Sequence, residues 1–400
     1  QDSFFSSSIM ATTVLDCTVA GVGPVAVRVR PLAINLLVGD EQPSYSFDLA
    51  GRLIGAFVDG VNYRRGLDGR VLRKQAGDAG RVREWLAPDQ ADQFVSGAYR
   101  LAQAVAVACG GGPLAPLMGW TDRRIAEDVA AFRRIYRPVS ILPPDQYLAL
   151  VLQATEGCSY NRCTFCSFYR DRPFRIKGPA ELRAHIRQVQ AFFGPALDLR
   201  RSLFLADANA LVAPLPRVHA WLDEIDAAGI QRPGGIFSFI DAFDAGRKSR
   251  SDWAELAARG LRRVYIGMES GDDALLRFLR KPGTAADVID AVRTLKAAQV
   301  AVSVIIMTGI GGSRFAGDHV AHTLAALQAM PLTRGDLVYF SPFFEQPGSE
   351  YGVIAATEGL APLSWTETAQ QEDALRAALK DYWGAGGPLL ARYDIREFVY

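Results

Sequence analysis

The chain has few cysteines and no imbalance of charge, and both absences exclude classes of protein. Five cysteines in 400 residues are too few for a scaffold held by disulfides, and an odd number of them suits a reducing compartment. Lysine and arginine number 44 against 43 aspartates and glutamates, a net charge of +1, so no overall field attracts a polyanion. We therefore expect a cytoplasmic protein for which nucleic acid is disfavoured as a partner.

Long hydrophobic runs are also absent. No segment reaches the roughly 18 apolar residues that a membrane span requires, so we expect no association with a membrane. The opening QDSFFSSSIMATT lacks a basic segment followed by an apolar stretch, and we expect no signal peptide there. With 49% hydrophobic residues, the chain has the composition of an ordinary globular protein with a sizeable core.

The most informative feature that is present is a tight group of cysteines, Cys158, Cys163 and Cys166, in GCSYNRCTFCSFYR. Thiolates are soft ligands that select zinc, copper(I) or iron–sulfur over magnesium or calcium. A structural zinc ion takes four ligands, and the fourth has to come from far away in the sequence. A [4Fe–4S] cluster bound by three cysteines keeps one iron open for a small molecule. The triplet favours a cluster, with a zinc site and inert buried thiols as alternatives.

From about residue 145 the chain alternates short apolar segments with amphipathic ones, as repeated βα units of a parallel sheet do. We expect strands at 147–153, 202–205, 235–240, 263–268, 300–307 and 337–341 and helices at 179–193, 215–228, 252–259, 285–298 and 318–330. The sequence therefore predicts an α/β fold with a partial (β/α)6 TIM-like barrel. Chemistry in such barrels lies at the C-terminal ends of the strands, and the cysteine segment follows the first strand.

Segments outside the barrel have other patterns. Residues 25–74 alternate apolar and polar positions between glycines and prolines, which predicts β-hairpins, and helices are expected at 88–108 and 120–136. A helix is expected at 366–382, before a glycine-rich tail. The expected organisation is an N-terminal mixed α/β domain over 1–140, the barrel over 141–345, and a C-terminal loop and helical tail over 346–400.

Together with the cysteines, the strand ends resemble the radical S-adenosylmethionine superfamily over roughly residues 145–345, in particular the barrel of oxygen-independent coproporphyrinogen oxidases. The resemblance implies that the three cysteines bind the cluster. Phe165, just before the third cysteine, stands where members place an aromatic residue against the adenine. The usual spacing in the family is Cys-x3-Cys-x2-Cys, and this chain has one residue more between the first two cysteines.

Further strand ends carry the same resemblance, and it implies cofactor-binding roles for Asp207 and Asn209, Glu269 and Ser270, and Gly309 and Gly311. The first pair matches the family's Gly-Gly-Glu-like motif in place and polarity but not in letters. Each pair also has an ordinary explanation, as a turn or helix cap, a helix start or a loop. Their order on successive strand ends is what supports the functional interpretation.

The resemblance implies a [4Fe–4S] cluster and S-adenosylmethionine, which is cleaved to a 5′-deoxyadenosyl radical that abstracts hydrogen from a small-molecule or biosynthetic substrate. It also implies flavodoxin or ferredoxin as the electron donor. The first 184 residues contain no histidine, so the Asp-x-His motif of cobalamin-binding members is not expected there. A tRNA-modifying member and a non-enzymatic zinc or iron–sulfur module are the alternatives.

Two neighbouring features have both structural and functional interpretations. A basic run brackets the cysteines, either as a solvated face or as a collar for an acidic donor protein or a substrate anion: Arg162, Arg170, Arg172, Arg175 and Lys177. The segment SPFFEQPGSE or the N-terminal domain would cap the barrel. Aromatic residues there would line a substrate cavity or simply pack in the core: Phe340, Phe343, Phe344 and Tyr351.

Overall fold

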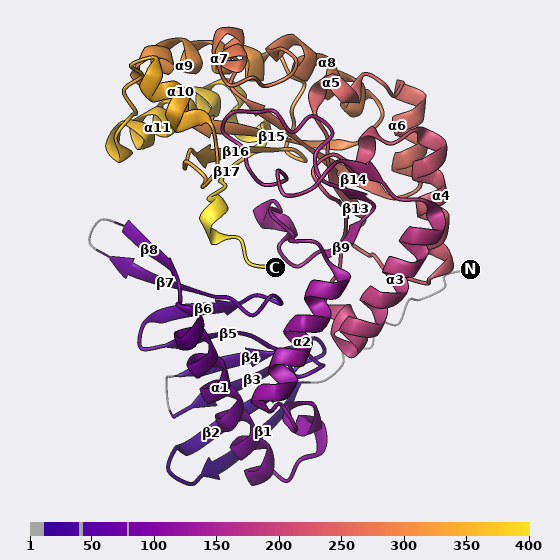
Figure 1. Cartoon of the computed structure of the whole chain (residues 1–400), viewed down its shortest axis with the longest axis vertical. Helices are drawn as coiled ribbons and strands as arrows, with labels where there is room; N and C mark the ends of the chain where they lie inside the picture. Colours follow the sequence, from indigo (N-terminus) through magenta and orange to yellow (C-terminus); the bar gives the residue numbers. More distant parts are fainter. Residues whose placement is uncertain (1–11, 40–42, 78–79) are drawn as a thin grey trace. The chain divides into compact units, whose positions relative to one another are not determined.

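The computed structural model describes residues 12–39, 43–77 and 80–400, and the chain forms two compact units (Figure 1). The first unit comprises the described residues up to Pro138, together with Gln188–Arg200 and Arg396–Tyr400. The second unit comprises Val139–Arg187 and Arg201–Ile395. Each unit therefore contains residues from distant parts of the sequence.

The first unit is built on an antiparallel sheet in which each strand pairs with the next along the chain. Its strands are β1 (Thr13–Val19), β2 (Gly23–Val29), β3 (Ile34–Val38), β4 (Ser44–Phe47), β5 (Leu53–Val58), β6 (Val61–Arg65), β7 (Val71–Gly77) and β8 (Gly80–Trp85). Alternation along β2 and β3 buries Val25, Val27, Ile34 and Leu36 on one face, as the two-residue period of a strand requires. The hairpins expected from this alternation are confirmed.

Two helices of the first unit follow the sheet, α1 (Pro88–Ala108) and α2 (Asp122–Ile135). A proline in the first turn suits the start of α1. The side chain of Thr121 caps α2 by accepting a hydrogen bond from the backbone N–H of Arg124. Small and branched residues of α1, including Ala98, Ala102 and Val105, join the sheet's apolar face in one core.

The last residues of the chain pack in the first unit. The backbone N–H of Leu67 donates to the carbonyl of Tyr400 at 2.7 Å. The Glu397 carboxylate accepts from Arg83 at 2.7 Å and from Lys74 at 3.3 Å. Residues 396–400 are thus held by both backbone and charged contacts.

The second unit contains a parallel sheet of the order β17-β16-β15-β14-β13-β12-β9. Its strands are β9 (Leu150–Gln153), β12 (Leu203–Ala206), β13 (Ile236–Phe239), β14 (Leu261–Glu269), β15 (Ala301–Thr308), β16 (Leu337–Pro342) and β17 (Leu389–Arg392). Every residue of β9, β12 and β16 is buried, because helices cover parallel sheets on their faces. The six expected strands are confirmed, and the sequence-based prediction missed the seventh, β17.

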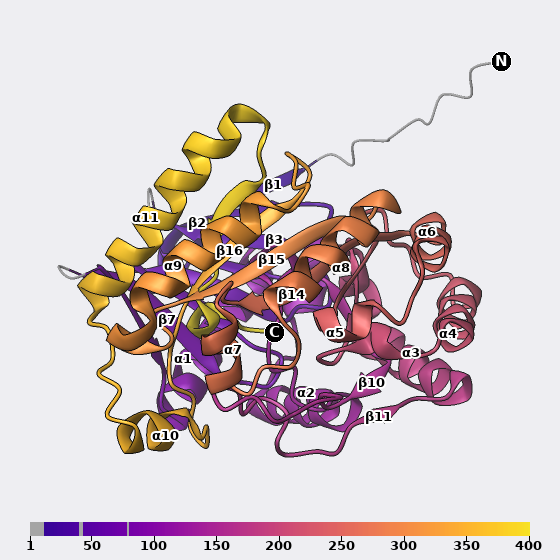
Figure 2. The same ribbon diagram turned by 90° about the horizontal axis from the view of Figure 1, so that it is seen from above.

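Helices of the second unit alternate with these strands, and α3 crosses into the first unit: α3 (Pro179–Phe193), α4 (Leu215–Ala227), α5 (Ala242–Ala245), α6 (Arg250–Ala258), α7 (Asp273–Phe278), α8 (Ala285–Ala297), α9 (Gly312–Gln328), α10 (Tyr351–Thr357) and α11 (Trp365–Trp383). Figure 2 shows α4, α6, α8 and α9 arranged in sequence around the strands. Helix α9 begins at Gly312, six residues before the expected start at 318. The α/β barrel fold is confirmed.

Short elements complete the two units. A two-stranded antiparallel ladder of β10 (Thr155–Glu156) and β11 (Arg175–Ile176) closes the segment that carries the cysteines. The 3-10 helices are Gly112–Leu117, Pro144–Gln146, Gly194–Leu199, Ala210–Val212, Gly384–Gly386 and Ile395–Glu397.

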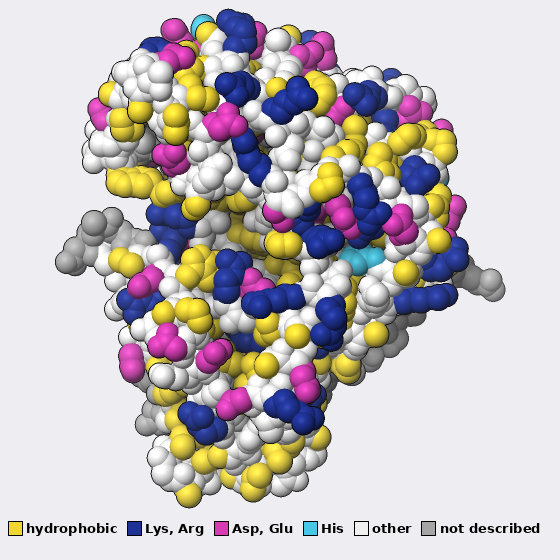
Figure 3. Space-filling model, viewed as in Figure 1, with side chains coloured by type: hydrophobic (Ala, Val, Ile, Leu, Met, Phe, Trp, Pro, Cys, Tyr) yellow, Lys and Arg dark blue, Asp and Glu magenta, His cyan; other side chains and the backbone are white. Residues whose placement is uncertain are grey.

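The surface carries charges of both signs (Figure 3), as the near-zero net charge of the sequence suggests. On the face drawn in Figure 3, basic and acidic side chains both occur on each unit, and neither sign covers a unit alone. Among the described residues, no helix combines the length and the apolar character needed to cross a membrane.

Candidate active site

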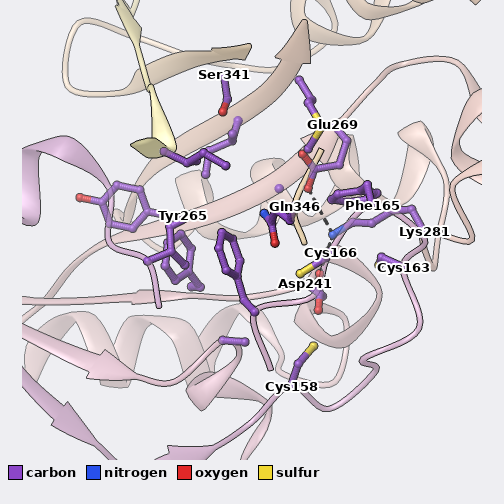
Figure 4. A pocket seen from close by; sticks show the side chains of 18 of the residues that line it. Cys158, Cys163, Phe165, Cys166, Asp241, Tyr265, Glu269, Lys281, Ser341 and Gln346 are labelled. Carbon is purple, nitrogen blue, oxygen red and sulfur yellow. Dashed lines mark hydrogen bonds and ion pairs between the residues drawn. The ribbon is translucent and has the colours of Figure 1, made fainter. Parts of the chain in front are cut away.

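A cavity of about 1050 Å³, counting its open mouth, lies at the C-terminal ends of the second unit's strands. Residues at the ends of β13, β14, β15 and β16 contribute to its wall, as do all three cysteines of the triplet. Figure 4 shows Cys163, Phe165 and Lys281 on one side of this cavity and Tyr265 on the other. The cavity therefore occupies the position where parallel barrels carry out chemistry.

The cysteine segment is held in place by its backbone. The Thr164 N–H donates to the carbonyl of Leu279 at 3.0 Å, and the Thr164 carbonyl accepts from the N–H groups of Glu350 and Tyr351 at 2.9 and 3.0 Å. At the start of the segment Gly157 has φ +77°, and a Cβ there would lie 3.0 Å from the carbonyl oxygen of Pro173. The segment is thus tied to the loops that follow α7 and β16.

Burial changes the acidity of the three thiols. It raises the pKa of Cys163 to about 12 and that of Cys166 to about 11. Burial also raises the pKa of Cys158, and the nearby carboxylate of Asp241 raises it further. Metals bind thiolates rather than thiols, so metal binding here would displace protons.

The donor set fits a sulfur-ligated metal group. The three cysteines are free and half-buried, and their placement around one cavity suits a cluster that binds a separate thiolate through each of three irons. Among the described residues, no group of three His, Cys, Asp or Glu side chains converges on a single metal ion. We therefore consider the residues present compatible with a [4Fe–4S] cluster.

Beside the thiols lies a buried group of three charges. The Lys281 ammonium lies 2.8 Å from the Asp241 carboxylate and 3.6 Å from that of Glu269. Burial lowers the pKa of Lys281, but the two carboxylates outweigh it and hold that pKa well above its usual value. Burial raises the pKa of Glu269, while Lys281 opposes that change. Lys281 therefore remains a cation, and it stabilises the charged form of Glu269.

The backbone aims Glu269 at the cavity. Glu269 has φ +63°, in the left-handed region, and the pairing of β14 with β15 shifts register between Gly267 and Glu269. Bulges of this kind commonly redirect a side chain at the end of a strand. Phe165, only 8% exposed, also lines the cavity. These two predicted cofactor residues lie together with the cysteines.

Asp207 and Asn209 lie near the cysteine segment but are not among the residues that line the cavity. The Asp207 carboxylate accepts hydrogen bonds from the Gln153 amide at 2.9 Å and from the Gly157 N–H at 3.0 Å. The Asn209 amide donates to Ser159 at 2.9 Å and to Asp244 at 2.7 Å. Both side chains therefore brace the start of the cysteine segment.

The other predicted cofactor residues also lie outside the cavity wall. The Ser270 hydroxyl is 2.7 Å from His319 Nδ1. The Gly309 N–H donates to Gln371 at 2.8 Å, and the Gly311 N–H donates to the Tyr351 hydroxyl at 3.0 Å. These hydrogen bonds connect the ends of β14 and β15 to helices α9, α10 and α11.

Most of the basic run is already paired within the second unit. Arg170 pairs with Glu350 at 2.7 Å and Arg175 with Glu181 at 2.6 Å, while Lys177 lies 3.4 Å from Glu156. Arg172 is buried 3.7 Å from Asp207. Arg162 is exposed. The run therefore braces the cysteine segment more than it forms a free basic collar.

The sequence-based prediction missed most residues of the cavity wall, among them Asp241, Lys281 and Tyr265. Asp241 comes two residues after β13, and its strand-end position was the available signal. Lys281 lies in the loop after α7 and Tyr265 lies inside β14, and neither position has a local signal. Of the four aromatic residues suggested for a substrate cavity, Phe343 and Phe344 line it, and Phe340 and Tyr351 are not among its lining residues.

Comparisons with known proteins agree with this geometry. Residues 152–316 match the family described as the radical SAM superfamily. The 4′-phospho-dehydrooxetanocin synthase of Priestia megaterium is 25% identical over 212 residues, which cover 48% of this chain and 28% of the relative. The chain thus spans less than a third of the length of that relative.

Two solved structures are similar to the chain only at TM-scores below 0.5. Coproporphyrinogen III oxidase from Escherichia coli is 13% identical, with 59% of this chain and 52% of that chain covered and a TM-score of 0.42. The methyltransferase TsrM from Kitasatospora setae, solved with cobalamin and a [4Fe–4S] cluster bound, is 19% identical, with 56% and 44% covered and a TM-score of 0.40.

The family match runs from the end of β9 into the start of α9 and includes the whole cysteine segment. Within it, three free thiols and the strand-end carboxylate of Glu269 line one cavity. Members of the matched family use a [4Fe–4S] cluster and S-adenosylmethionine, and the donor set found here fits that cluster. Residues 152–316 are thus similar to the radical S-adenosylmethionine superfamily, and the cavity that carries the three cysteines lies largely within that match.

Proposed function

We propose that the protein is a radical S-adenosylmethionine enzyme that acts on a small molecule. The supporting observation is that Cys158, Cys163 and Cys166 line the same cavity as the charged pair of Glu269 and Lys281. Residues 141–345 supply this proposed chemistry, with N-terminal and C-terminal segments over 1–140 and 346–400. Gln346, Tyr393 and Ile395 of the latter segment extend the cavity wall.

In this proposal the three cysteines bind the cluster as thiolates. When bound, the cluster and S-adenosylmethionine together supply a 5′-deoxyadenosyl radical that takes a hydrogen atom from a substrate carbon. The Glu269 carboxylate accepts hydrogen bonds from the cofactor's ammonium or ribose hydroxyls, and Lys281 keeps that carboxylate charged and in position. Phe165 packs against the adenine. The protein's part is binding, orientation and the exclusion of water.

Residues behind the wall have a different proposed role. Asp207 and Asn209 fix the start of the cysteine segment through their hydrogen bonds, and Ser270, Gly309 and Gly311 fix the strand ends from the helix side. They position the residues that contact the cofactor and do not contact it themselves. Substituting them is expected to disturb the conformation of the cysteine segment and the strand ends, without removing a direct contact with the cofactor.

One electron must enter for each cleavage, and we propose a reduced flavodoxin or ferredoxin as its source. For the substrate, we do not extend the phosphorylated compound in the relative's name to this chain. Lys281 is the one lysine or arginine among the described residues that line the cavity, and two carboxylates already hold it. A phosphate would find no free cation there.

The test is anaerobic reconstitution with iron and sulfide, reduction with dithionite, addition of S-adenosylmethionine, and mass spectrometry of the products. We expect 5′-deoxyadenosine and methionine in equal amounts from the wild type and neither from Cys163→Ala. Cys109→Ala, which changes a cysteine of the first unit, is the matched control and should cleave normally. A protein that carries zinc, or that has its full iron and cleaves nothing, would contradict the proposal.

A further inference from the structure

Besides the thiols and the charged residues, the cavity wall contains a set of aromatic and aliphatic residues that we call the aromatic lobe: Ile141, Phe239, Tyr265, Ile305, Tyr393 and Ile395. The ring centroids of Phe239 and Tyr265 are 5.7 Å apart, and the ring planes meet at 62°. In Figure 4 Tyr265 lies on the side opposite to Lys281 and Cys163. Tyr265 of the lobe thus faces the proposed cofactor residues across the same cavity (Figure 4).

The two tyrosines of the lobe use their hydroxyl groups elsewhere. The Tyr265 hydroxyl donates to Asp145 at 2.6 Å, and the Tyr393 hydroxyl donates to the carbonyl of Leu142 at 2.7 Å. The Asp145 carboxylate is further paired with Arg263 at 3.1 Å and accepts from Tyr339 at 2.8 Å. What the two tyrosines offer to a ligand is therefore ring surface.

Polar groups near the lobe are few and uncharged. The Ser341 hydroxyl lies in the cavity wall, and among the described residues it has no hydrogen-bond partner. Gln346 accepts at its side-chain oxygen from the N–H and the hydroxyl of Ser167, both at 3.2 Å, so its amide N–H groups are not used in those bonds. The charged residues of the wall are Asp241, Glu269 and Lys281, which form the group of three charges beside the thiols.

Burying an unpaired charge in such surroundings is costly, whereas an apolar group gains from leaving water. We propose that the aromatic lobe binds the substrate and selects an uncharged, largely apolar group with one hydrogen-bonding function, which Ser341 receives. This inference rests on the proposed function, because it names the substrate of that reaction. A substrate carbon held in the lobe would lie next to the cofactor, ready to give up its hydrogen atom.

The test uses two fluorescent probes that share one apolar skeleton. N-phenyl-1-naphthylamine is neutral and has one N–H, and 8-anilinonaphthalene-1-sulfonate adds an anionic group. Both are titrated against the full-length, anaerobically reconstituted protein with saturating S-adenosylmethionine and no reductant. We expect the neutral probe to bind at least about tenfold more tightly than the anionic one, because the lobe offers no cation to the sulfonate.

Variants locate the binding. Ile141→Asp places a charge in the lobe from a half-buried loop position and should weaken the neutral probe by about tenfold. Leu148→Asp, an exposed position in the same connecting segment, is the matched control and should change the affinity for the neutral probe by less than about twofold. Ser341→Ala should weaken binding of the neutral probe roughly threefold. If Ile141→Asp does not fold, Ile395→Asp makes the same test from a residue far away in the sequence.

The outcomes separate the two proposals, because S-adenosylmethionine cleavage by the wild type is measured on the same preparation. Cleavage together with loss of the neutral probe in Ile141→Asp supports the aromatic lobe. Cleavage with equal binding of both probes, or with an unaffected Ile141→Asp, overturns the lobe and leaves the proposed function standing. An unaffected Ser341→Ala overturns the hydrogen-bonding role. Absence of cleavage overturns the proposed function and with it the assignment of the lobe to a substrate.

Discussion

At the scale of single residues, Glu269 is the carboxylate with the most specific placement. Its side chain faces the cavity from a left-handed backbone position, and Lys281 lies 3.6 Å away. We expect Glu269→Gln to keep its iron content but to bind S-adenosylmethionine about tenfold more weakly, because a neutral amide attracts an ammonium less than a carboxylate does.

Equilibrium dialysis with the reconstituted protein measures this affinity, and iron analysis measures the cluster. Glu358→Gln removes a surface carboxylate paired with Arg314 and serves as the control. Unchanged affinity in Glu269→Gln would return Glu269 to a purely structural role at the end of β14.

His319 predicts a dependence of stability on pH. Burial lowers its pKa to about 4 from the usual 6.5, so the unfolded chain binds a proton more readily than the folded protein. Stability is therefore complete above pH 6.5 and is lost as the pH falls from there toward 4. We expect a loss of roughly 2 kcal/mol between pH 7 and pH 5 in urea unfolding.

The control for this effect is His319→Asn, whose neutral amide keeps a polar partner for Ser270. This variant should lack the loss that the wild type shows between pH 7 and pH 5. An equal loss in both proteins would assign the effect to other groups.

Residues of the cavity wall could be found from the sequence where their signal is local. The spacing of the cysteines singles them out, and Phe165 and Glu269 are singled out by a neighbouring motif or strand end. Lys281 could not be found in this way, because its role comes from Asp241 and Glu269, which lie 40 and 12 residues before it. Asp207 was predicted to bind the cofactor, and its hydrogen bond with the Gly157 N–H could not be foreseen from the sequence.

At the scale of elements, the start of α9 depends on close packing. Gly312 has φ +55°, and a Cβ there would overlap the carbonyl oxygen of Ala361, a backbone atom that cannot move aside easily. We expect Gly312→Ala to lower the free energy of unfolding by more than about 2 kcal/mol, since it adds overlap to an unfavourable backbone conformation.

The same helix supplies the matched variant. Gly317 is exposed, with nothing within 4 Å of a Cβ at that position, so Gly317→Ala should raise stability by about 0.5–1 kcal/mol. Denaturant unfolding of both variants measures the difference. If the two substitutions change stability equally, the backbone at Ala361 shifts easily to make room for the added Cβ.

The elements were predictable from sequence to the degree that their apolar pattern was strong. The six expected strands have runs of buried residues, and the structure places all six in one parallel sheet. Strand β17 is the short sequence LLAR after a glycine-rich turn, with no fully buried residue. Its pairing with β16 is a tertiary interaction that local pattern does not report. The start of α9 was missed because its first turn is a glycine-rich loop sequence.

At the scale of the whole molecule, Glu397 ties the last residues to the first unit's sheet. Burial raises the pKa of Glu397, but Arg83 and Lys74 outweigh it and hold the pKa below its usual 4.5. The contribution of this carboxylate to stability is therefore present above pH 4.5 and is lost as the pH falls further.

We expect Glu397→Gln to lower the free energy of unfolding by about 2 kcal/mol near neutral pH, because it removes a carboxylate charge that pairs with two partly buried cations. The difference from the wild type should shrink below pH 4.5. Glu84→Gln, at an exposed pair with Arg73, should cost less than about 0.5 kcal/mol. Thermal unfolding from pH 7 to pH 3.5 measures both. A difference that stays constant with pH would rule out the charged form of Glu397 as its source.

The placement of the last dozen residues has a consequence for synthesis on the ribosome. Strand β17 pairs with β16 at one end of the parallel sheet, and Arg396–Tyr400 belong to the first unit. The second unit therefore lacks some of its residues until translation reaches Ile395, and the first unit lacks some until translation reaches Tyr400. A nascent chain that stops before Leu389 leaves the apolar strand β16 with a free hydrogen-bonding edge, which is a site for aggregation. Chaperones and quality-control proteases would recognise such a truncated chain at this edge.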